Sequence, residues 1–205
     1  MNDISLFKGI EENDIEKLLK SLDARKINYK KNRTIVTNII NVKMIGIILS
    51  GTAIMERYDY NGNRSIIEKL EKNSLFGELF SRLGSDISVI ATSNCEVLLI
   101  EYNNILKNSK NIILINNMFN ILSEKILKLN MREEILSKRT IRDKLLTYFS
   151  ILANDKPNRV FVLPFTYTDL ADYLSIDRSA MMREIKYLQD DLLIEKNGKK
   201  IKIMY

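Results

Sequence analysis

One stretch near the C-terminus carries side chains suited to recognition chemistry. Basic and hydrogen-bonding residues recur there at the spacing of one helix face: Arg178, Ser179, Met182, Arg183 and Lys186. A guanidinium group can donate two hydrogen bonds to O6 and N7 of guanine, so we expect Arg178 and Arg183 to read bases. Ser179 offers a shorter donor or acceptor to a base or a phosphate. The stretch therefore predicts a helix that reads DNA in the major groove.

A helix-turn-helix is predicted to position this face. Thr166 and Asp169 fit a capping box at the start of a short helix over 167–173. After a brief turn, Asp177 caps a second helix over about 178–189. Two short helices joined by a tight turn are the geometry that places the second helix in the major groove.

A β-hairpin is predicted to follow as a wing. Residues 193–196 and 199–203 flank Asn197-Gly198, a pair typical of a type I′ turn. Side chains of the wing and of the preceding helix N-terminus are expected to hold phosphates and fix the register on DNA: Lys196, Lys199, Lys200, Thr166 and Thr168. Seven basic and four acidic residues between 178 and 204 give this module a net charge of +3, a modest electrostatic footprint for DNA.

The composition argues against several other chemistries. The 205 residues include no His and a single Cys, Cys95. Neither a His-ligated haem nor an iron–sulfur cluster is therefore expected, and no metal site is predicted. Cys95 lies in a strand-like pattern and is interpreted as a small buried apolar residue. Paired acids at 11–12 and 190–191 are typical of helix ends, and no Gly-rich phosphate loop occurs, so we do not expect an enzyme.

The chain as a whole has the composition of a globular protein, with 45% hydrophobic residues and a net charge of +6. The first residues lack the basic and apolar segments of a signal peptide, and the longest apolar run, 44–49, has the length of a strand. We therefore expect a cytoplasmic protein without a membrane partner.

The middle of the chain is predicted to be rich in short strands, after a helical lead-in over 1–20. Six β-rich runs alternate with turn signals: 34–36, 45–49, 52–58, 64–70, 87–91 and 96–100. Asn61-Gly62 stands between two of them and is a strong hairpin signal, because both positions favour a positive φ. This spacing predicts a small barrel or a jelly-roll-like sandwich.

A long helix with two apolar flanks is predicted after residue 103. One flank alternates spacings of three and four and is expected to meet the same flank of a second copy: Ile112, Ile115, Phe119, Leu122, Ile126 and Leu129. The other flank, Leu114, Met118 and Ile121, is expected to dock on the strand-rich region. A helix packed only within its own subunit is the alternative, and we favour the homodimer. A further helix is predicted over 138–153.

Six segments in this order resemble the Crp/Fnr family of bacterial transcription regulators: LFKGI at 6–10, IILSG at 47–51, DYNGNR at 59–64, FGELF at 76–80, NCEVLLI at 94–100 and DLADYLSIDRSAMMREI at 169–185. The resemblance implies an α+β architecture in three parts. These are a jelly-roll-like β-roll of the cyclic-nucleotide-binding type over 1–102, a dimerisation helix and hinge over 103–137, and a winged helix-turn-helix over 138–205.

The resemblance also implies that Arg178, Ser179 and Arg183 occupy the base-reading positions of the family. Ser179 stands where many members have Glu, so the common half-site of the family is not expected to apply unchanged.

The β-roll is the expected effector site, and the resemblance places five residues there: Gly77, Glu78, Leu79, Ser88 and Val89. In nucleotide-binding members a Gly-Glu pair precedes an Arg-Ser or Arg-Thr pair, whose arginine neutralises the cyclic phosphate. Here that second pair falls on Ser88-Val89 or, counted back from Cys95, on Ser85-Asp86, and neither supplies a cation. Burial of an uncompensated phosphate is costly, so tight binding of cyclic AMP or cyclic GMP is not expected and the effector is unknown.

The leading hypothesis is a homodimeric transcription regulator that reads an inverted repeat in double-stranded DNA, with RNA polymerase as a further candidate partner. One alternative is a switch gated by a non-nucleotide small molecule in the β-roll. The other is a protein-interaction module whose winged helix no longer binds DNA.

Overall fold

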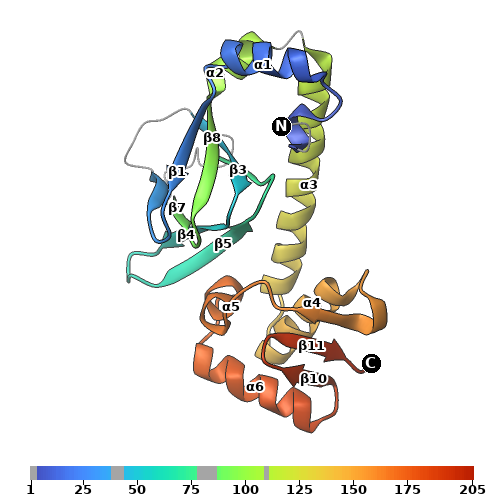
Figure 1. Cartoon of the computed structure of the whole chain (residues 1–205). Coiled ribbons are helices and arrows are strands. Elements are labelled where there is room, and N and C mark those ends of the chain that lie inside the picture. The colour runs from blue at the N-terminus through green and yellow to red at the C-terminus, as the bar shows by residue number, and fades with distance from the viewer. Residues whose placement is uncertain (1–3, 38–43, 78–86, 109–110) are drawn as a thin grey trace. The chain divides into compact units, whose positions relative to one another are not determined.

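A computed structural model of the chain describes residues 4–37, 44–77, 87–108 and 111–205. The chain divides into two compact units, Met1–Lys125 and Ile126–Tyr205 (Figure 1). The long helix α3 (Ile112–Leu136) begins in the first unit and ends in the second.

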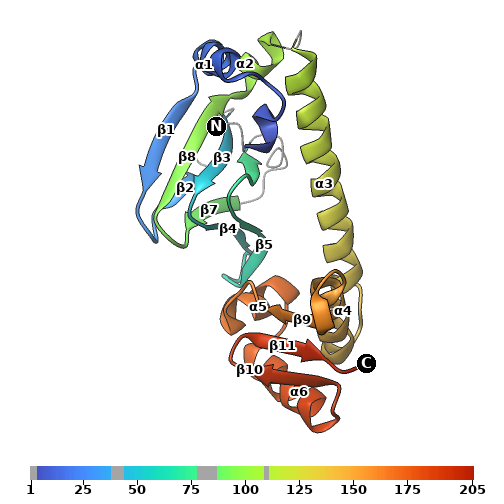
Figure 2. The same cartoon turned by 45° about the vertical axis from the view of Figure 1, so that its right-hand side comes forward.

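Two antiparallel four-stranded sheets form the body of the first unit (Figure 2). Their strands are β1 (Arg25–Tyr29), β2 (Thr34–Thr37), β3 (Met44–Ser50), β4 (Ala53–Tyr58), β5 (Arg64–Leu70), β6 (Leu75–Gly77), β7 (Ile87–Ala91) and β8 (Cys95–Glu101). The strand order is β1-β8-β3-β6 in one sheet and β2-β7-β4-β5 in the other. Two sheets built from strands that alternate along the chain are a jelly-roll-like arrangement, so the predicted β-roll is confirmed.

Two of these strands, β1 and β6, are missed by the sequence pattern. Four of the five residues of β1 are exposed, so its side chains show no alternation. β6 has three residues, too few for a periodic signal. Both are defined by long-range pairing, β1 with β8 and β6 with β3.

Strands of both sheets contribute to one apolar cluster. Its buried members are Ile35, Ile48, Ala53, Met55, Leu70, Phe76, Val89, Ala91, Cys95 and Val97. Within it the Phe76 ring packs against Gly46, where an added Cβ would lie 2.2 Å from Phe76 Cζ. Glycine at position 46 therefore makes room for an aromatic ring, and this contact holds β6 against β3.

The β4–β5 hairpin confirms the predicted turn at Asn61-Gly62 but not its geometry. Gly62 has a φ of 81°, whereas Asn61 is not among the residues with a positive φ. Asp59 organises the loop, because its carboxylate accepts hydrogen bonds from the N–H groups of Asn61 and Asn63, both at 2.8 Å. These bonds, with the side-chain amide of Asn63 contributing most, lower the pKa of Asp59.

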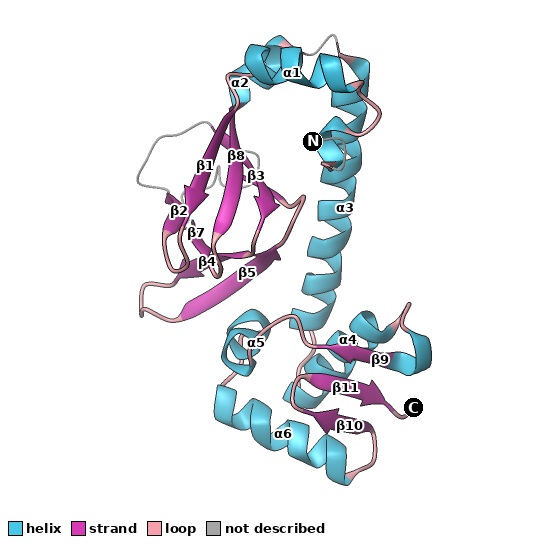
Figure 3. Cartoon of the chain, in the orientation of Figure 1, coloured by secondary structure: helices cyan, strands magenta, loops and turns pink. Residues whose placement is uncertain are grey.

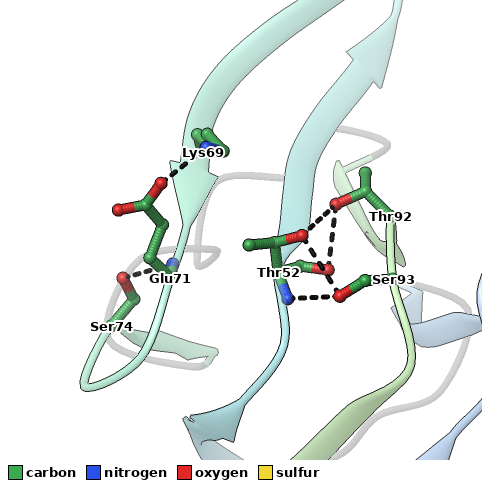
Figure 4. A network of polar contacts seen from close by, with 6 residues as sticks. All are labelled: Thr52, Lys69, Glu71, Ser74, Thr92 and Ser93. Atoms are coloured by element: carbon green, nitrogen blue, oxygen red, sulfur yellow. Dashed lines mark hydrogen bonds and ion pairs between the residues drawn. The ribbon is translucent and has the colours of Figure 1, made fainter. Parts of the chain in front are cut away.

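A polar network joins the β3–β4 turn to the β7–β8 turn (Figure 4). The Thr52 N–H donates to Ser93 Oγ at 2.8 Å, and the hydroxyls of Thr52 and Thr92 are 2.8 Å apart. The thiol of Cys95 donates to the Thr52 carbonyl at 3.0 Å and is only 3% exposed. The prediction that Cys95 is buried is therefore confirmed.

Helices pack on the β-roll within the first unit. They are the 3₁₀ helix η1 (Ser5–Phe7), α1 (Glu12–Ser21), α2 (Tyr102–Lys107) and the first part of α3. Leu114 and Met118 of α3 are buried in a second apolar cluster, and Ile121 packs against it, so the predicted docking flank is confirmed. Leu122 also packs against this cluster. Leu122, expected on the partner-facing flank, is thus half-buried and also contacts the docked side of the helix.

The second unit combines helices with a small sheet (Figure 3). Its elements after α3 are α4 (Ile141–Ala153), η3 (Pro157–Arg159), β9 (Val160–Val162), α5 (Tyr167–Leu174), α6 (Arg178–Asp190), β10 (Ile194–Asn197) and β11 (Lys200–Ile203). The strands form an antiparallel sheet in the order β10-β11-β9. The predicted helix-turn-helix and wing are thus confirmed, and with them the α+β class. None of the helices in the described part of the chain is long and apolar enough to cross a bilayer.

Candidate nucleic-acid interface

The first helix of the motif, α5, begins at a Thr166 cap. Thr166 Oγ1 accepts a hydrogen bond from the Asp169 N–H at 3.1 Å and donates one to Asp169 Oδ2 at 2.7 Å. The helix ends at Ser175, whose φ of 53° lies in the left-handed region, and the Ile176 N–H then donates back to the Ala171 carbonyl at 3.1 Å. This C-terminal cap turns the chain sharply towards α6.

The second helix, α6, is fixed by its own cap and by a buried face. Asp177 Oδ1 accepts a hydrogen bond from the Ala180 N–H at 2.7 Å. Met181, Ile185 and Leu188 are fully or almost fully buried. Because these residues lie on one side of the helix, they fix its rotation and leave the opposite side outward.

The outward side of α6 carries all five residues of the predicted reading face. Arg178, Ser179, Arg183 and Lys186 are exposed, and Met182 is half-buried. Arg178, Met182 and Lys186 follow one another at intervals of four, with Ser179 and Arg183 in the adjoining row. The structure therefore brings these side chains together on one surface without a carboxylate among them.

Two acidic side chains of this region are instead paired with α4. Arg142 lies 3.3 Å from Glu184 Oε1 and 2.5 Å from Asp191 Oδ2. The hydrogen bond to Asp191 raises the pKa of Arg142. Because Arg142 of α4 binds both carboxylates, these two side chains are held towards α4 and not among the cations of the outward face of α6. No local pattern signals Arg142, whose partners lie 42 and 49 residues further along the chain.

The wing is attached to the start of α5 through Tyr167. Its hydroxyl donates to the Gly198 carbonyl at 2.6 Å, and Lys196 Nζ lies 5.2 Å from the centroid of its ring. Burial raises the pKa of Tyr167. Tyr167 is thus a positioning residue for the wing that the sequence pattern does not reveal.

The turn of the wing differs from the predicted type I′ turn at Asn197-Gly198. Asn197 pairs with Lys200, so Gly198 and Lys199 are the two turn residues. Within this turn only Gly198 has a positive φ, 58°, the pattern of a type II′ turn. The one-residue shift places Lys199 at the tip and Lys200 at the start of β11, with both side chains exposed.

The two threonines at the start of α5 differ in their engagement. Both are exposed, but the Thr166 hydroxyl already serves the helix cap. Thr168 lies in the first turn, where backbone N–H groups can donate hydrogen bonds to an anion such as phosphate.

In the β-roll, three of the five expected effector residues lie within the described ranges. Glu78 and Leu79 lie outside the described residues. Gly77 ends β6 with a φ of 114°, and an added Cβ would lie 2.2 Å from the Met44 carbonyl oxygen. Backbone packing therefore accounts for glycine at this position.

The other two expected effector residues lie on β7. Val89 is 3% exposed and belongs to the apolar cluster, whereas Ser88 is half-buried and pairs in register with Glu56 of β4. Glu56 is itself buried and lies 2.7 Å from Arg64. Ser88-Val89 thus adds a hydroxyl and an apolar side chain but no cation.

No group of three or more His, Cys, Asp or Glu side chains in the described ranges is placed to hold a metal ion.

The expected dimer seam lies on α3. Ile112, Phe119, Ile126 and Leu129 are 72%, 66%, 58% and 47% exposed, and Ile115 is half-buried. Ile112, Phe119 and Ile126 recur every seven residues and therefore share one edge of the helix. Large apolar side chains left in water along one edge are typical of a surface that meets a partner.

Two family models match the chain, one within each of its two compact units. A family model described as "Cyclic nucleotide-binding domain" matches residues 26–109, and one described as "Crp-like helix-turn-helix domain" matches residues 143–204. No curated protein matches the chain in sequence.

Several solved structures share the fold. A mutant of CooA from Carboxydothermus hydrogenoformans has a TM-score of 0.81 at 15% identity, covering 99% of this chain and 91% of that one. The c-di-GMP-responsive global regulator CLP of Xanthomonas campestris has a TM-score of 0.72 at 16% identity, covering 95% and 100%. A Crp/Fnr family regulator from Eubacterium rectale has a TM-score of 0.65 at 14% identity, covering 98% and 93%.

The two matched domains define a transcription regulator in which a domain of the cyclic-nucleotide-binding type precedes a Crp-type helix-turn-helix. With this domain order and fold, the chain belongs to the Crp/Fnr family.

Proposed function

We propose that the chain binds double-stranded DNA as a homodimer and regulates transcription by reading an inverted repeat with α6. The observation that carries this proposal is the outward face of α6. It exposes Arg178, Arg183 and Lys186, while Arg142 binds the nearby carboxylates of Glu184 and Asp191. Such a face suits the negative potential and the guanine edges of the major groove.

Each side chain has a role in this proposal. Arg178 and Arg183 read guanines, and Ser179 contacts a base or a phosphate. Phosphates are held from the wing and from the start of α5, by Lys196, Lys199, Lys200, Thr166 and Thr168. In this arrangement RNA polymerase is the partner through which a bound regulator acts.

Homodimerisation rests on the exposed apolar edge of α3. Two copies paired along Ile112, Phe119 and Ile126 would remove these side chains from water. A two-fold pair of reading helices requires half-sites centred about 34 Å apart, one turn of duplex.

A selection from random duplex DNA with the full chain tests binding and symmetry together. The expected product is an inverted repeat with the half-site spacing given above, bound in fluorescence anisotropy at physiological salt. No enrichment over the starting library, or equal affinity for all duplexes, would contradict the proposal and favour a module that binds protein. Repeating the selection with cell extract asks whether a small molecule is needed.

Gating by a small molecule is the second candidate, supported by the match of residues 26–109 to a cyclic-nucleotide-binding domain. We propose that cyclic AMP and cyclic GMP are not the effectors, because Ser88-Val89 offers no counter-charge for a phosphate on β7. A non-nucleotide effector is the form of gating compatible with this segment. Calorimetric titration should give no binding of either nucleotide at micromolar concentration, and micromolar binding would contradict this proposal.

A further inference from the structure

Met182 is the only apolar side chain among the five residues of the predicted reading face on α6. Its neighbour Met181 points inward and is 0% exposed, whereas Met182 is half-buried between the cationic residues of the face. It lies one turn after Arg178 and directly before Arg183, the two side chains proposed to reach bases. A thioether at this place can reach the floor of the groove but cannot donate a hydrogen bond.

The major groove offers one apolar group for such a side chain. Thymine carries a C5 methyl group there, and apolar contact with this methyl distinguishes an A·T pair from its alternatives. The five residues of the face include no carboxylate, the group that would accept a hydrogen bond from the amino group of cytosine. The face therefore carries no side chain that would favour cytosine at the base pair next to Met182.

Resting on the proposed function, we propose that Met182 is a specificity-determining residue that contacts the C5 methyl of one thymine in each half-site. The contact excludes water from the methyl group and requires no hydrogen bond. The operator therefore needs a thymine at a fixed position beside the base pairs read by Arg178 and Arg183.

Deoxyuridine tests this contact, because it pairs with adenine as thymine does and lacks only the methyl group. Each thymine of the selected operator is replaced in turn by deoxyuridine, and binding of the full chain is measured by anisotropy. At one position per half-site, affinity should fall about fourfold, the effect of removing one methyl group from an apolar contact. Met182→Ala should bind the thymine operator about fourfold more weakly and show no loss at that deoxyuridine.

Two further variants are controls for a folding defect. Met182→Leu keeps an apolar side chain and should retain sensitivity to the methyl group. Met204→Ala removes an exposed methionine after β11 and should match the wild-type chain at every position. Far-ultraviolet circular dichroism should be the same for all variants.

The outcomes separate this inference from the proposed function. A selected operator whose thymines all tolerate deoxyuridine would overturn the role of Met182 alone. If Met182→Ala loses as much affinity as the wild-type chain when deoxyuridine replaces that thymine, the role of Met182 is also overturned. The methyl group would then be read by another side chain. Failure to select any operator would overturn the proposed function and this inference with it.

Discussion

Lys125 Nζ of α3 lies 2.8 Å from Glu68 Oε2 of β5, in an ion pair whose side chains are only 10% and 19% exposed. The same ammonium group donates to the Leu75 carbonyl at 3.1 Å. One charge therefore joins the helix to both β5 and β6 within the first unit. Because the two charges are largely withdrawn from water, each depends on the other for compensation.

Removal of this ammonium group should destabilise the first unit. Lys125→Ala leaves the Glu68 carboxylate shielded from water without its cation, and we expect a loss of about 2–3 kcal/mol in the free energy of unfolding. Lys125→Met and Glu68→Leu should each lower the free energy of unfolding. The double variant should lose less than the sum of these two losses, because it leaves neither charge without the other. Urea unfolding of the four proteins in this cycle measures the coupling.

The exposed pair Lys17–Asp14, with side chains 80% and 59% exposed, is the matched control. Lys17→Ala should change the stability by less than about 0.5 kcal/mol. Strict additivity in the Lys125–Glu68 cycle would show that the two charges do not depend on each other.

Arg183 and Lys199 should contribute to DNA binding in different ways. Arg183→Ala should lose about 1–3 kcal/mol of discrimination between the selected operator and a variant at one base pair. Lys199→Ala should weaken all duplexes alike and reduce the slope of log affinity against log salt by about 1. Anisotropy titrations at several salt concentrations measure both quantities. Lys17→Ala removes the same charge outside the winged helix and should leave both unchanged, and equal effects from all three variants would contradict the assignment.

The parts of the fold that depend on local sequence are the parts that could be predicted. The caps at Thr166 and Asp177, which start α5 and α6, are local signals and stand where expected. Long-range partners leave no such signal, so β1 and β6 are missed, as are the pairs made by Arg142 and Lys125. The wing turn lies between these cases: Asn197-Gly198 marks the hairpin, but pairing of Asn197 with Lys200 shifts the turn by one residue.

The exposed edge of α3 should control the oligomeric state. Phe119→Glu places a charge at a position that is 66% exposed in the single chain and would be buried in a pair of helices. We expect a monomer in sedimentation at micromolar concentration and at least a tenfold loss of operator affinity, since one copy can engage only one half-site. Tyr60→Glu, at a position 96% exposed in the β4–β5 loop, is the control and should stay dimeric. A wild-type chain that sediments as a monomer would refute the dimer itself.

Two glycines with nearly the same φ allow backbone strain to be separated from steric conflict. Gly51 and Gly62 have φ values of 83° and 81°. A Cβ at Gly51 would lie 2.1 Å from the Asn94 carbonyl oxygen, whereas nothing lies within 4 Å of a Cβ at Gly62. Gly62→Ala should cost about 1 kcal/mol, the penalty of a left-handed alanine, and Gly51→Ala should cost clearly more. Thermal unfolding compares the two variants, and equal losses would show that the β3–β4 turn yields without cost.

The phenol of Tyr148 should make stability depend on alkaline pH. Tyr148 is 4% exposed, and its hydroxyl has no hydrogen-bond partner within the described part of the chain. Burial, with a smaller contribution from Tyr173, raises the pKa of Tyr148 far above its ordinary value of 10.0. Below pH 10 the phenol is protonated in both the folded and the unfolded chain, so it adds no pH dependence. Above pH 10 only the unfolded chain releases the proton, and stability falls by about 1.4 kcal/mol per pH unit from this group.

Tyr148→Phe removes both the titrating group and the hydroxyl without a partner. At pH 7 the variant should be at least as stable as the wild-type chain, because the buried hydroxyl loses its hydrogen bonds to water without gaining any in the fold. Its stability should also fall less steeply between pH 10 and 11, as measured by urea unfolding across this range. Tyr60→Phe, on an exposed side chain, should follow the wild-type profile. A parallel decline in Tyr148→Phe and the wild-type chain would mean that the Tyr148 phenol ionises in the folded state as readily as in water, which its burial against the Tyr173 ring should prevent.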